Sequence, residues 1–267
     1  MSWSLGVIGC GNMSYALVKG ICRSEQQRPD RIYTNDVNEA RLDLFAQEFA
    51  ALRADKTDLI NACDLIFLGV KPNQVRAALG DTKSAWNGDK ILLSIAAGIR
   101  TGSLEEILSP NVPRIIRAMP NTPCLVGAGM AGLCAGSTAG TADLEMVKGL
   151  FAASGKAIVV KEHDMDAIAA VSGSGPAYVF LAIEAMMEAA VNVGLSRAAA
   201  RELVLQTVKG SVIMLEESGE HPAVLKQQVT SPAGTTIAAL RQLEAGGIRQ
   251  AFFDAIEAAR DRSIELG

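Results

Sequence analysis

The sequence predicts an α/β protein with an N-terminal, mostly parallel sheet domain followed by an all-helical domain. From Ser4 to about Val160, short apolar β-rich runs alternate with segments of helical periodicity, as in a parallel sheet covered on both faces. The first run leads directly into a glycine turn and a helix, and strand signals stop after Glu162. We therefore expect two domains, residues 1–163 and 164–267, with the boundary near Lys161–Asp166.

Seven runs in the first half have strand character. Helical segments separate most of the early ones, for example Asn38–Ala50, and Asp143–Ser154 is expected to be the last helix of this half. The expected strands are Leu5–Ile8, Arg31–Thr34, Asp64–Val70, Lys90–Ile95, Arg114–Ala118, Met130–Cys134 and Ala157–Val160.

The second half carries helix start and stop signals. Pro176 opens a helix that runs to Val193 with Gly194 just beyond its end, and Ser196 caps a second helix that ends near Ser218. The remaining expected helices are Val224–Gln228, Ile237–Glu244 and Ile248–Glu265.

The helix that begins at Pro176 is apolar on nearly every side, and such a helix must be surrounded. A helical domain of about 100 residues has difficulty surrounding it alone. We infer an oligomer in which a partner supplies the cover; burial against the first domain is the alternative. Glu184 and Glu188 interrupt the apolar run, which argues against a membrane span.

Composition narrows the function classes. A net charge of −4 and a pI of about 5.4 argue against nucleic-acid binding, which usually needs a basic face. The start, MSWSLGVIGCG, lacks the basic and long apolar regions of a signal peptide. The five cysteines are odd in number and without CxxC spacing, so we expect reduced thiols in a cytoplasm and no metal site.

The segment LGVIGCGNMSYALVKG predicts a Rossmann-type dinucleotide site. In Gly9-x-Gly11-x-x-Ser14, Gly9 permits the tight turn, and Gly11 lets the backbone approach a pyrophosphate at the start of the next helix. Ser14 and Ala16 are small enough for close packing of helix and strand. Because the motif joins an apolar strand to a helix, it favours a nicotinamide dinucleotide over a plain helix entry.

Two further positions bear on the cofactor. The second strand ends at Asn35 and Asp36: an inward Asn35 would tolerate a 2′-phosphate, whereas an inward Asp36 would favour NAD, and no arginine adjoins them in the sequence. Lys71, at a strand end, either contacts the cofactor or faces water.

Three segments resemble the pyrroline-5-carboxylate reductase family, whose members reduce a cyclic imino acid to L-proline with NAD(P)H, the last step of proline biosynthesis. They are RAMPNTPCLVGAGMAGL (Arg117 to Leu133), SGSGPAY (Ser172 to Tyr178) and TSPAGTTIAALRQLE, in which Ala233 stands where glycine is commonest. The resemblance covers effectively the whole chain. It implies a Rossmann domain followed by a helical dimerisation domain, a homodimer, and a decamer of five dimers as a larger assembly.

The resemblance also implies site residues. The cofactor, expected to be NADPH with NADH as the alternative, would be bound by Gly9, Cys10, Gly11, Asn12, Met13, Asn35, Val70, Lys71, Pro72, Ala96, Ala97 and Asn121. Lys56 stands where the family often has asparagine near the adenosine ribose, and it would either recruit a 2′-phosphate or face water. The substrate would be bound by Val229, Ser231, Gly234, Thr235 and Thr236.

The stretch Ser231–Thr236 has a physical explanation of its own. It opens a helix whose free N–H groups can bind a carboxylate, and Gly234 leaves room for that group. The alternative is an ordinary capped helix start. A neighbouring nicotinamide domain favours the carboxylate site.

The absence of a strong proton donor favours imine reduction. There is no lysine between Lys161 and Lys209, and the only histidines, His163 and His221, fall in expected loops. A protonated imine accepts hydride readily, so positioning supplies most of the catalysis. We expect Thr236 to hydrogen-bond the ring nitrogen and Ser174 to border the nicotinamide with Asn121; Tyr178 is a less favoured donor.

Two rival functions remain open. One is a reductase of the same architecture that acts on another cyclic imine or on a 3-hydroxy acid. The other is a nucleotide-sensing protein without turnover.

Overall fold

The computed structural model describes residues 3–24 and 27–266. It divides the chain into two compact units: Met1–Ser174 with Ala258–Gly267, and Gly175–Glu257. The first two residues of the stretch used to argue against a signal peptide lie outside the described residues.

The first unit extends past the expected boundary at residue 163. The reason is packing: the Ile168 side chain lies on Gly132 of the sheet, and Gly173 lies against the end of the Met119 side chain. The C-terminal residues also return to this unit, where the Ser263 hydroxyl donates to Asp166 at 2.7 Å.

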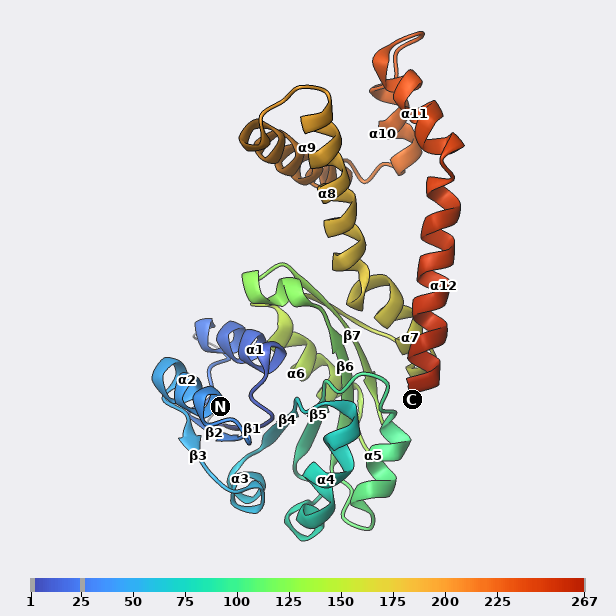
Figure 1. Ribbon diagram of the computed structural model, residues 1–267. Helices are drawn as coiled ribbons and strands as arrows, with labels where there is room; N and C mark the ends of the chain where they lie inside the picture. Colours follow the sequence, from blue (N-terminus) through green and yellow to red (C-terminus); the bar gives the residue numbers. More distant parts are fainter. Residues whose placement is uncertain (1–2, 25–26, 267) are drawn as a thin grey trace. The chain divides into compact units, whose positions relative to one another are not determined.

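An eight-stranded sheet forms the centre of the first unit, in the order β3-β2-β1-β4-β5-β6-β7-β8 (Figure 1). All neighbouring pairs are parallel except β6 and β7, which are antiparallel. The strands are β1 (Ser4–Ile8), β2 (Arg31–Asn35), β3 (Leu52–Arg53), β4 (Leu65–Leu68), β5 (Ile91–Ser94), β6 (Arg114–Pro120), β7 (Gly129–Ala135) and β8 (Gly155–Val159). The mostly parallel sheet is confirmed; β3 was missed because two exposed residues carry no pattern.

Helices cover both faces of this sheet, as its continuously apolar strands require. On one face, Leu17, Phe45 and Val147 pack against the strands, and on the other face Leu59, Leu79 and Leu104 do so. The helices of the first face are α1 (Asn12–Arg23), α2 (Glu39–Phe49) and α6 (Thr141–Phe151). Those of the second face are α3 (Lys56–Ala62), α4 (Val75–Leu79) and α5 (Thr101–Leu108).

The second unit is helical, as predicted. Its helices are α8 (Gly175–Asn192), α9 (Arg197–Ser218), α10 (Pro222–Gln228), α11 (Thr235–Ala245) and α12 (Ile248–Leu266), the last of which ends in the first unit. The predicted caps are present. Gly194 has φ 103° just after α8, and the Ser196 hydroxyl accepts a hydrogen bond from the Ala199 N–H at the start of α9.

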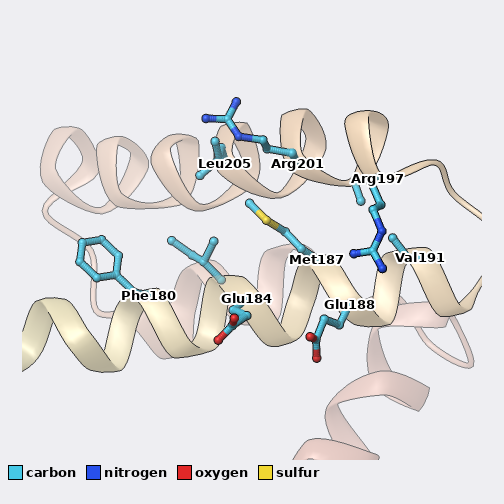
Figure 2. A pocket seen from close by; sticks show the side chains of 10 residues that line it. Phe180, Glu184, Met187, Glu188, Val191, Arg197, Arg201 and Leu205 are labelled. Carbon is cyan, nitrogen blue, oxygen red and sulfur yellow. The ribbon is translucent and has the colours of Figure 1, made fainter.

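Helix α8 has no buried residue in the single chain, although all of its residues are described. A groove of about 500 Å³ lies between α8 and α9, lined by apolar side chains such as Phe180 and Met187 and by Glu184, Glu188, Arg197 and Arg201 (Figure 2). By length and composition alone, the helical run Glu162–Asn192 could also cross a membrane. The apolar surface of α8 therefore lacks cover within one chain.

Candidate active site

The turn between β1 and α1 has the geometry of a dinucleotide cradle. Gly9 has φ 93°, and a Cβ there would lie 2.7 Å from the backbone of Gly69 and Val70, so only glycine fits. Ser14 lies 2.1 Å from where a Cβ on Gly69 would be, and its hydroxyl donates to the Gly9 carbonyl at 2.7 Å. The serine in the third motif position thus holds the turn together.

The start of α1 is free to receive an anion. Gly11 is its N-cap, and no side chain among the described residues caps it. A Cβ on Gly11 would meet only the Gly69 carbonyl oxygen, at 3.9 Å, so the approach to the helix amides is open. Free amides at a helix start suit a pyrophosphate, and the residues present fit a dinucleotide.

The predicted cofactor residues fall at one edge of the sheet. The parallel registers align Ile8 with Asn35 and Leu68, and Leu68 with Ser94, so the segments that follow these strands lie at the same carboxyl edge. The strand order reverses direction between β1 and β4, which is where ligands bind in such sheets. The structure gathers here Gly9, Cys10, Gly11, Asn12, Met13, Asn35, Val70, Lys71, Pro72, Ala96, Ala97 and Asn121.

Lys71 and Lys56 differ in what they can offer a ligand. Lys71 is exposed at the carboxyl edge, and its ammonium makes no ion pair with any described residue. The Lys56 ammonium donates to the Ala77 carbonyl of α4 at 3.1 Å. This hydrogen bond connects Lys56 to α4.

Asn35, the last residue of β2, and Asp36, which follows it, bind different backbone groups. Asn35 donates its side-chain N–H to the Ala54 carbonyl at 2.8 Å, whereas the Asp36 carboxylate accepts the Cys10 N–H of the glycine turn at 2.5 Å. No arginine adjoins Asn35 or Asp36 in the sequence, but the fold brings one to the glycine turn. Arg41, on the first turns of α2, donates from Nε to the Cys10 carbonyl at 2.6 Å.

Asn121 is buried, and both polar atoms of its side chain make a hydrogen bond within the protein. Its Nδ2 donates to the Ser172 carbonyl at 3.0 Å, and its Oδ1 accepts the Met130 N–H at 2.9 Å. Ser172 belongs to a π-helical turn, Ala169–Gly173, a local widening often found at functional sites. The next residue, Ser174, is exposed and donates its N–H to Ala169 at 2.8 Å.

In the second unit, the predicted substrate stretch forms a helix start without a side-chain cap. The Ser231 hydroxyl oxygen lies 2.3 Å from where a Cβ on Gly234 would be, so it occupies the room that was expected beside this glycine. Gly234 is the N-cap of α11, and within the described part of the chain no side chain caps this helix. The preceding turn is closed by Gly234 N–H donating to the Ser231 carbonyl at 3.1 Å, with Ala233 in the left-handed region at φ 55°. Thr235 and Thr236 follow in the first turn, and Val229 lies just after α10.

The two histidines make local contacts. His163 is exposed next to Asp164, and His221 caps α10 by accepting the Ala223 N–H at 3.2 Å. Among residues 3–24 and 27–266, no three His, Cys, Asp or Glu side chains gather as metal ligands. All five cysteines are free thiols.

One buried charged residue was not anticipated. Arg117, only 3% exposed on β6, lies 3.6 Å from the Glu162 carboxylate. Glu162 also accepts the Thr101 N–H at 2.6 Å and the Thr101 hydroxyl at 2.7 Å. The three residues join β6, the start of α5 and the segment after β8. A charged residue in an apolar strand is the only sequence signal for this network.

Comparisons with known proteins agree on one family. The family model described as pyrroline-5-carboxylate reductase dimerisation matches residues 162–266, and the model described as NADP oxidoreductase, coenzyme F420-dependent, matches residues 4–98. The pyrroline-5-carboxylate reductase of Corynebacterium melassecola is 40% identical over 99% of this chain and 98% of its own length. That of Escherichia coli K12 is 39% identical over 100% and 99%.

Solved structures give the same result. The pyrroline carboxylate reductase of Plasmodium falciparum with NADP bound has a TM-score of 0.89 at 35% identity, covering 99% of this chain and 98% of the other. The Coxiella burnetii pyrroline-5-carboxylate reductase has a TM-score of 0.92 at 36% identity, covering 100% and 99%. With full-length identity at this level and the same fold throughout, the chain belongs to the pyrroline-5-carboxylate reductase family.

Proposed function

We propose that this chain reduces the C=N bond of L-1-pyrroline-5-carboxylate to give L-proline, the last step of proline biosynthesis, with NAD(P)H as the reductant. The observation that carries the proposal is the uncapped start of α11, where the Ser231–Thr236 stretch supplies amides and hydroxyls to an acid group. Relatives that share this chain over its full length carry the same activity in their names.

The first unit would bind the cofactor. The amides at the start of α1 receive the pyrophosphate, and the small residues Gly9 and Gly11 allow it to approach. Lys71, Ala96, Ala97, Asn121 and Ser174 would hold the nicotinamide half. When bound, NAD(P)H supplies the hydride.

The second unit would hold the substrate. The Gly234, Thr235 and Thr236 amides bind the substrate carboxylate, because an uncapped helix start combines free donors with a positive dipole end. The Ser231 hydroxyl adds a donor, and Val229 contributes an apolar contact. The Thr236 hydroxyl hydrogen-bonds the ring nitrogen and holds its proton there.

The proposed mechanism does not require a strong general acid or general base. The imine nitrogen can be protonated before the reaction, so the side chains mainly orient the substrate and exclude competing geometries. Such positioning can contribute roughly 7–11 kcal/mol in favourable cases. The exposed His163 and the capping His221 are consistent with a mechanism that does not use histidine.

Self-association accompanies this function, because residues 162–266 match a dimerisation family. We propose that a second copy covers the apolar side chains of α8 and the groove beside α9, which accounts for the apolar run Glu162–Asn192 without a membrane. Five dimers would form the decamer expected from the resemblance. We place the enzyme in the cytoplasm, where five free thiols stay reduced.

The test is oxidation of NADH and NADPH, followed at the nicotinamide absorbance, with pyrroline-5-carboxylate as substrate. Turnover with this imine, and at least tenfold less with pyrroline-2-carboxylate or a 3-hydroxy acid, is the expected result. Faster turnover with one of the other substrates would identify a different reductase. Cofactor binding without oxidation of any substrate would identify a nucleotide-sensing protein and overturn the proposal.

A further inference from the structure

Hydrogen bonds from two backbone N–H groups hold the Asp36 carboxylate next to the glycine turn. Its Oδ2 accepts the Cys10 N–H at 2.5 Å, and its Oδ1 accepts the Asn38 N–H at 2.8 Å. Asp36 directly follows β2, whose last residue aligns with the last residue of β1. In a parallel sheet of this kind, the adenosine ribose of a dinucleotide lies between these two strand ends.

The carboxylate has acceptor capacity left for a sugar. An ionised carboxylate offers about four acceptor positions, and the two backbone bonds occupy one on each oxygen. Two positions therefore remain, matching the two hydroxyl donors of an unmodified ribose. Asn35 does not compete for this role, because its side-chain N–H is bound to the Ala54 carbonyl.

A 2′-phosphate would meet the same carboxylate as an anion. It has no proton to donate near neutral pH, and its charge repels that of Asp36 at short range. The Lys56 ammonium donates to the Ala77 carbonyl at 3.1 Å, so turning fully toward a 2′-phosphate would break that hydrogen bond.

One fixed cation binds the carbonyl group of the same residue, Cys10. Arg41 donates from Nε to the Cys10 carbonyl at 2.6 Å, and its guanidinium lies 5.7 Å from the Tyr15 ring centre and 6.0 Å from that of Phe45. These contacts hold the group in place. Its Nη2 is shielded from solvent and has no hydrogen-bond partner among the residues that the structure describes. The guanidinium charge is therefore fixed beside the glycine turn, where it would attract an anionic ligand group.

We infer that Asp36 makes this enzyme select NADH over NADPH, and that Arg41 is the residue through which NADPH is still accepted. The inference rests on the proposed cofactor site. It assigns opposite roles to two side chains that bind the two backbone groups of one residue, Cys10.

The experiment measures binding without the imine, so that it is independent of turnover. The full chain is titrated with NADH and NADPH by nicotinamide fluorescence, and with 5′-AMP and adenosine 2′,5′-bisphosphate by calorimetry. The fragments isolate the adenosine end. We expect at least tenfold tighter binding of NADH than of NADPH, and of 5′-AMP than of the bisphosphate.

Three variants separate the two roles. Asp36→Ser should reverse the preference for both ligand pairs, and Asp36→Asn should at least abolish it while keeping an acceptor for the turn. Arg41→Met should weaken NADPH and the bisphosphate at least fivefold more than NADH and 5′-AMP. Asp89→Asn removes an exposed carboxylate before β5, at the opposite edge of the sheet, and should leave all four affinities unchanged.

A wild-type preference for NADPH, or an unchanged ratio in both folded Asp36 variants, would overturn the inference. Melting temperatures identify a variant that has lost its fold. Preferential NADH binding without imine reduction would refute the proposed function and leave the inference standing. Binding of neither cofactor would refute both.

Discussion

The side-chain amide of Asn121 donates a hydrogen bond to the carbonyl oxygen of Ser172 at 3.0 Å. Through it, the end of β6 is tied to the π-helical turn that precedes α8, and the same side chain accepts the Met130 N–H. The Asn121 side chain therefore makes two hydrogen bonds within the protein. The second N–H of Nδ2 and the second lone pair of Oδ1 are the side-chain groups that Asn121 could still offer a cofactor.

Replacing Asn121 with alanine should therefore lower stability and not only activity. The change leaves a donor and an acceptor without partners, at a cost of about 1–3 kcal/mol in the free energy of unfolding. Asn121→Asp should cost more, because a carboxylate repels the Ser172 carbonyl. Urea denaturation followed by circular dichroism measures both. Asn61→Ala, at an exposed helical position, is the control, and a loss no larger than the control's would contradict the assignment.

Thr236 provides the test of the proposed chemistry. Thr236→Val keeps the shape and removes the hydroxyl, so kcat/KM should fall tenfold or more, equivalent to about 1.5–3 kcal/mol for a hydrogen bond to a charged group. Thr236→Ser keeps the hydroxyl and should retain most of the activity. Steady-state kinetics with pyrroline-5-carboxylate make the comparison. If Thr236→Val has unchanged kinetics, the hydroxyl has no role in the reaction.

Two alanines have a left-handed backbone conformation. Replacing either of them with glycine should raise the free energy of unfolding, whereas the same change at an ordinary helical alanine lowers it. Ala50 ends α2 at φ 53°, and Ala233 precedes Gly234 at φ 55°. This conformation costs an L-residue roughly 1–2 kcal/mol, and glycine's extra unfolded-state entropy offsets only part of the relief. Ala50→Gly and Ala233→Gly should each raise the free energy of unfolding by about 0.5–1 kcal/mol.

The control for this pair is Ala46→Gly within α2 itself. A glycine inside a helix should lower stability by about 1 kcal/mol. Thermal and urea unfolding of all three variants show whether the signs differ. A loss of stability in Ala50→Gly as large as that in Ala46→Gly would argue against the left-handed cap.

Buried thiols should make the protein less stable at alkaline pH. Burial, chiefly through desolvation, raises the pKa of Cys63 and of Cys10 to about 12 and that of Cys134 to about 11. Between about pH 9 and 12 the unfolded chain loses these protons while the folded chain keeps them, so stability falls as pH rises. Each thiol contributes a slope of up to about 1.4 kcal/mol per pH unit.

The measurement is urea unfolding between pH 8.5 and 10.5 under reducing conditions. Cys63→Ala removes one titrating group and should flatten the slope by that amount, whatever its effect on stability at neutral pH. Ser4→Ala, which removes no titrating group, should keep the wild-type slope. Equal slopes in Cys63→Ala and wild type would mean that this thiol ionises as easily folded as unfolded.

Sequence patterns predicted those structural elements that depend on interactions between residues close together in the chain. Ser196 as a helix cap, Gly194 after a helix end and the apolar strands beside Gly9 follow from chemistry that acts over a few residues. The two-residue strand Leu52–Arg53 escaped prediction because it depends on a partner strand, not on its own pattern.

The sequence by itself determined the fold class, the glycine turn and the family, because each depends on short segments whose residue types have direct structural consequences. Only the tertiary structure shows that Asp36 and not Asn35 binds the glycine turn, that Arg41 reaches this turn, and that Lys56 binds α4. These depend on which backbone groups distant segments bring within reach of a side chain. Residue spacing along the chain does not specify these contacts. They are specified by the packing of helices on the sheet.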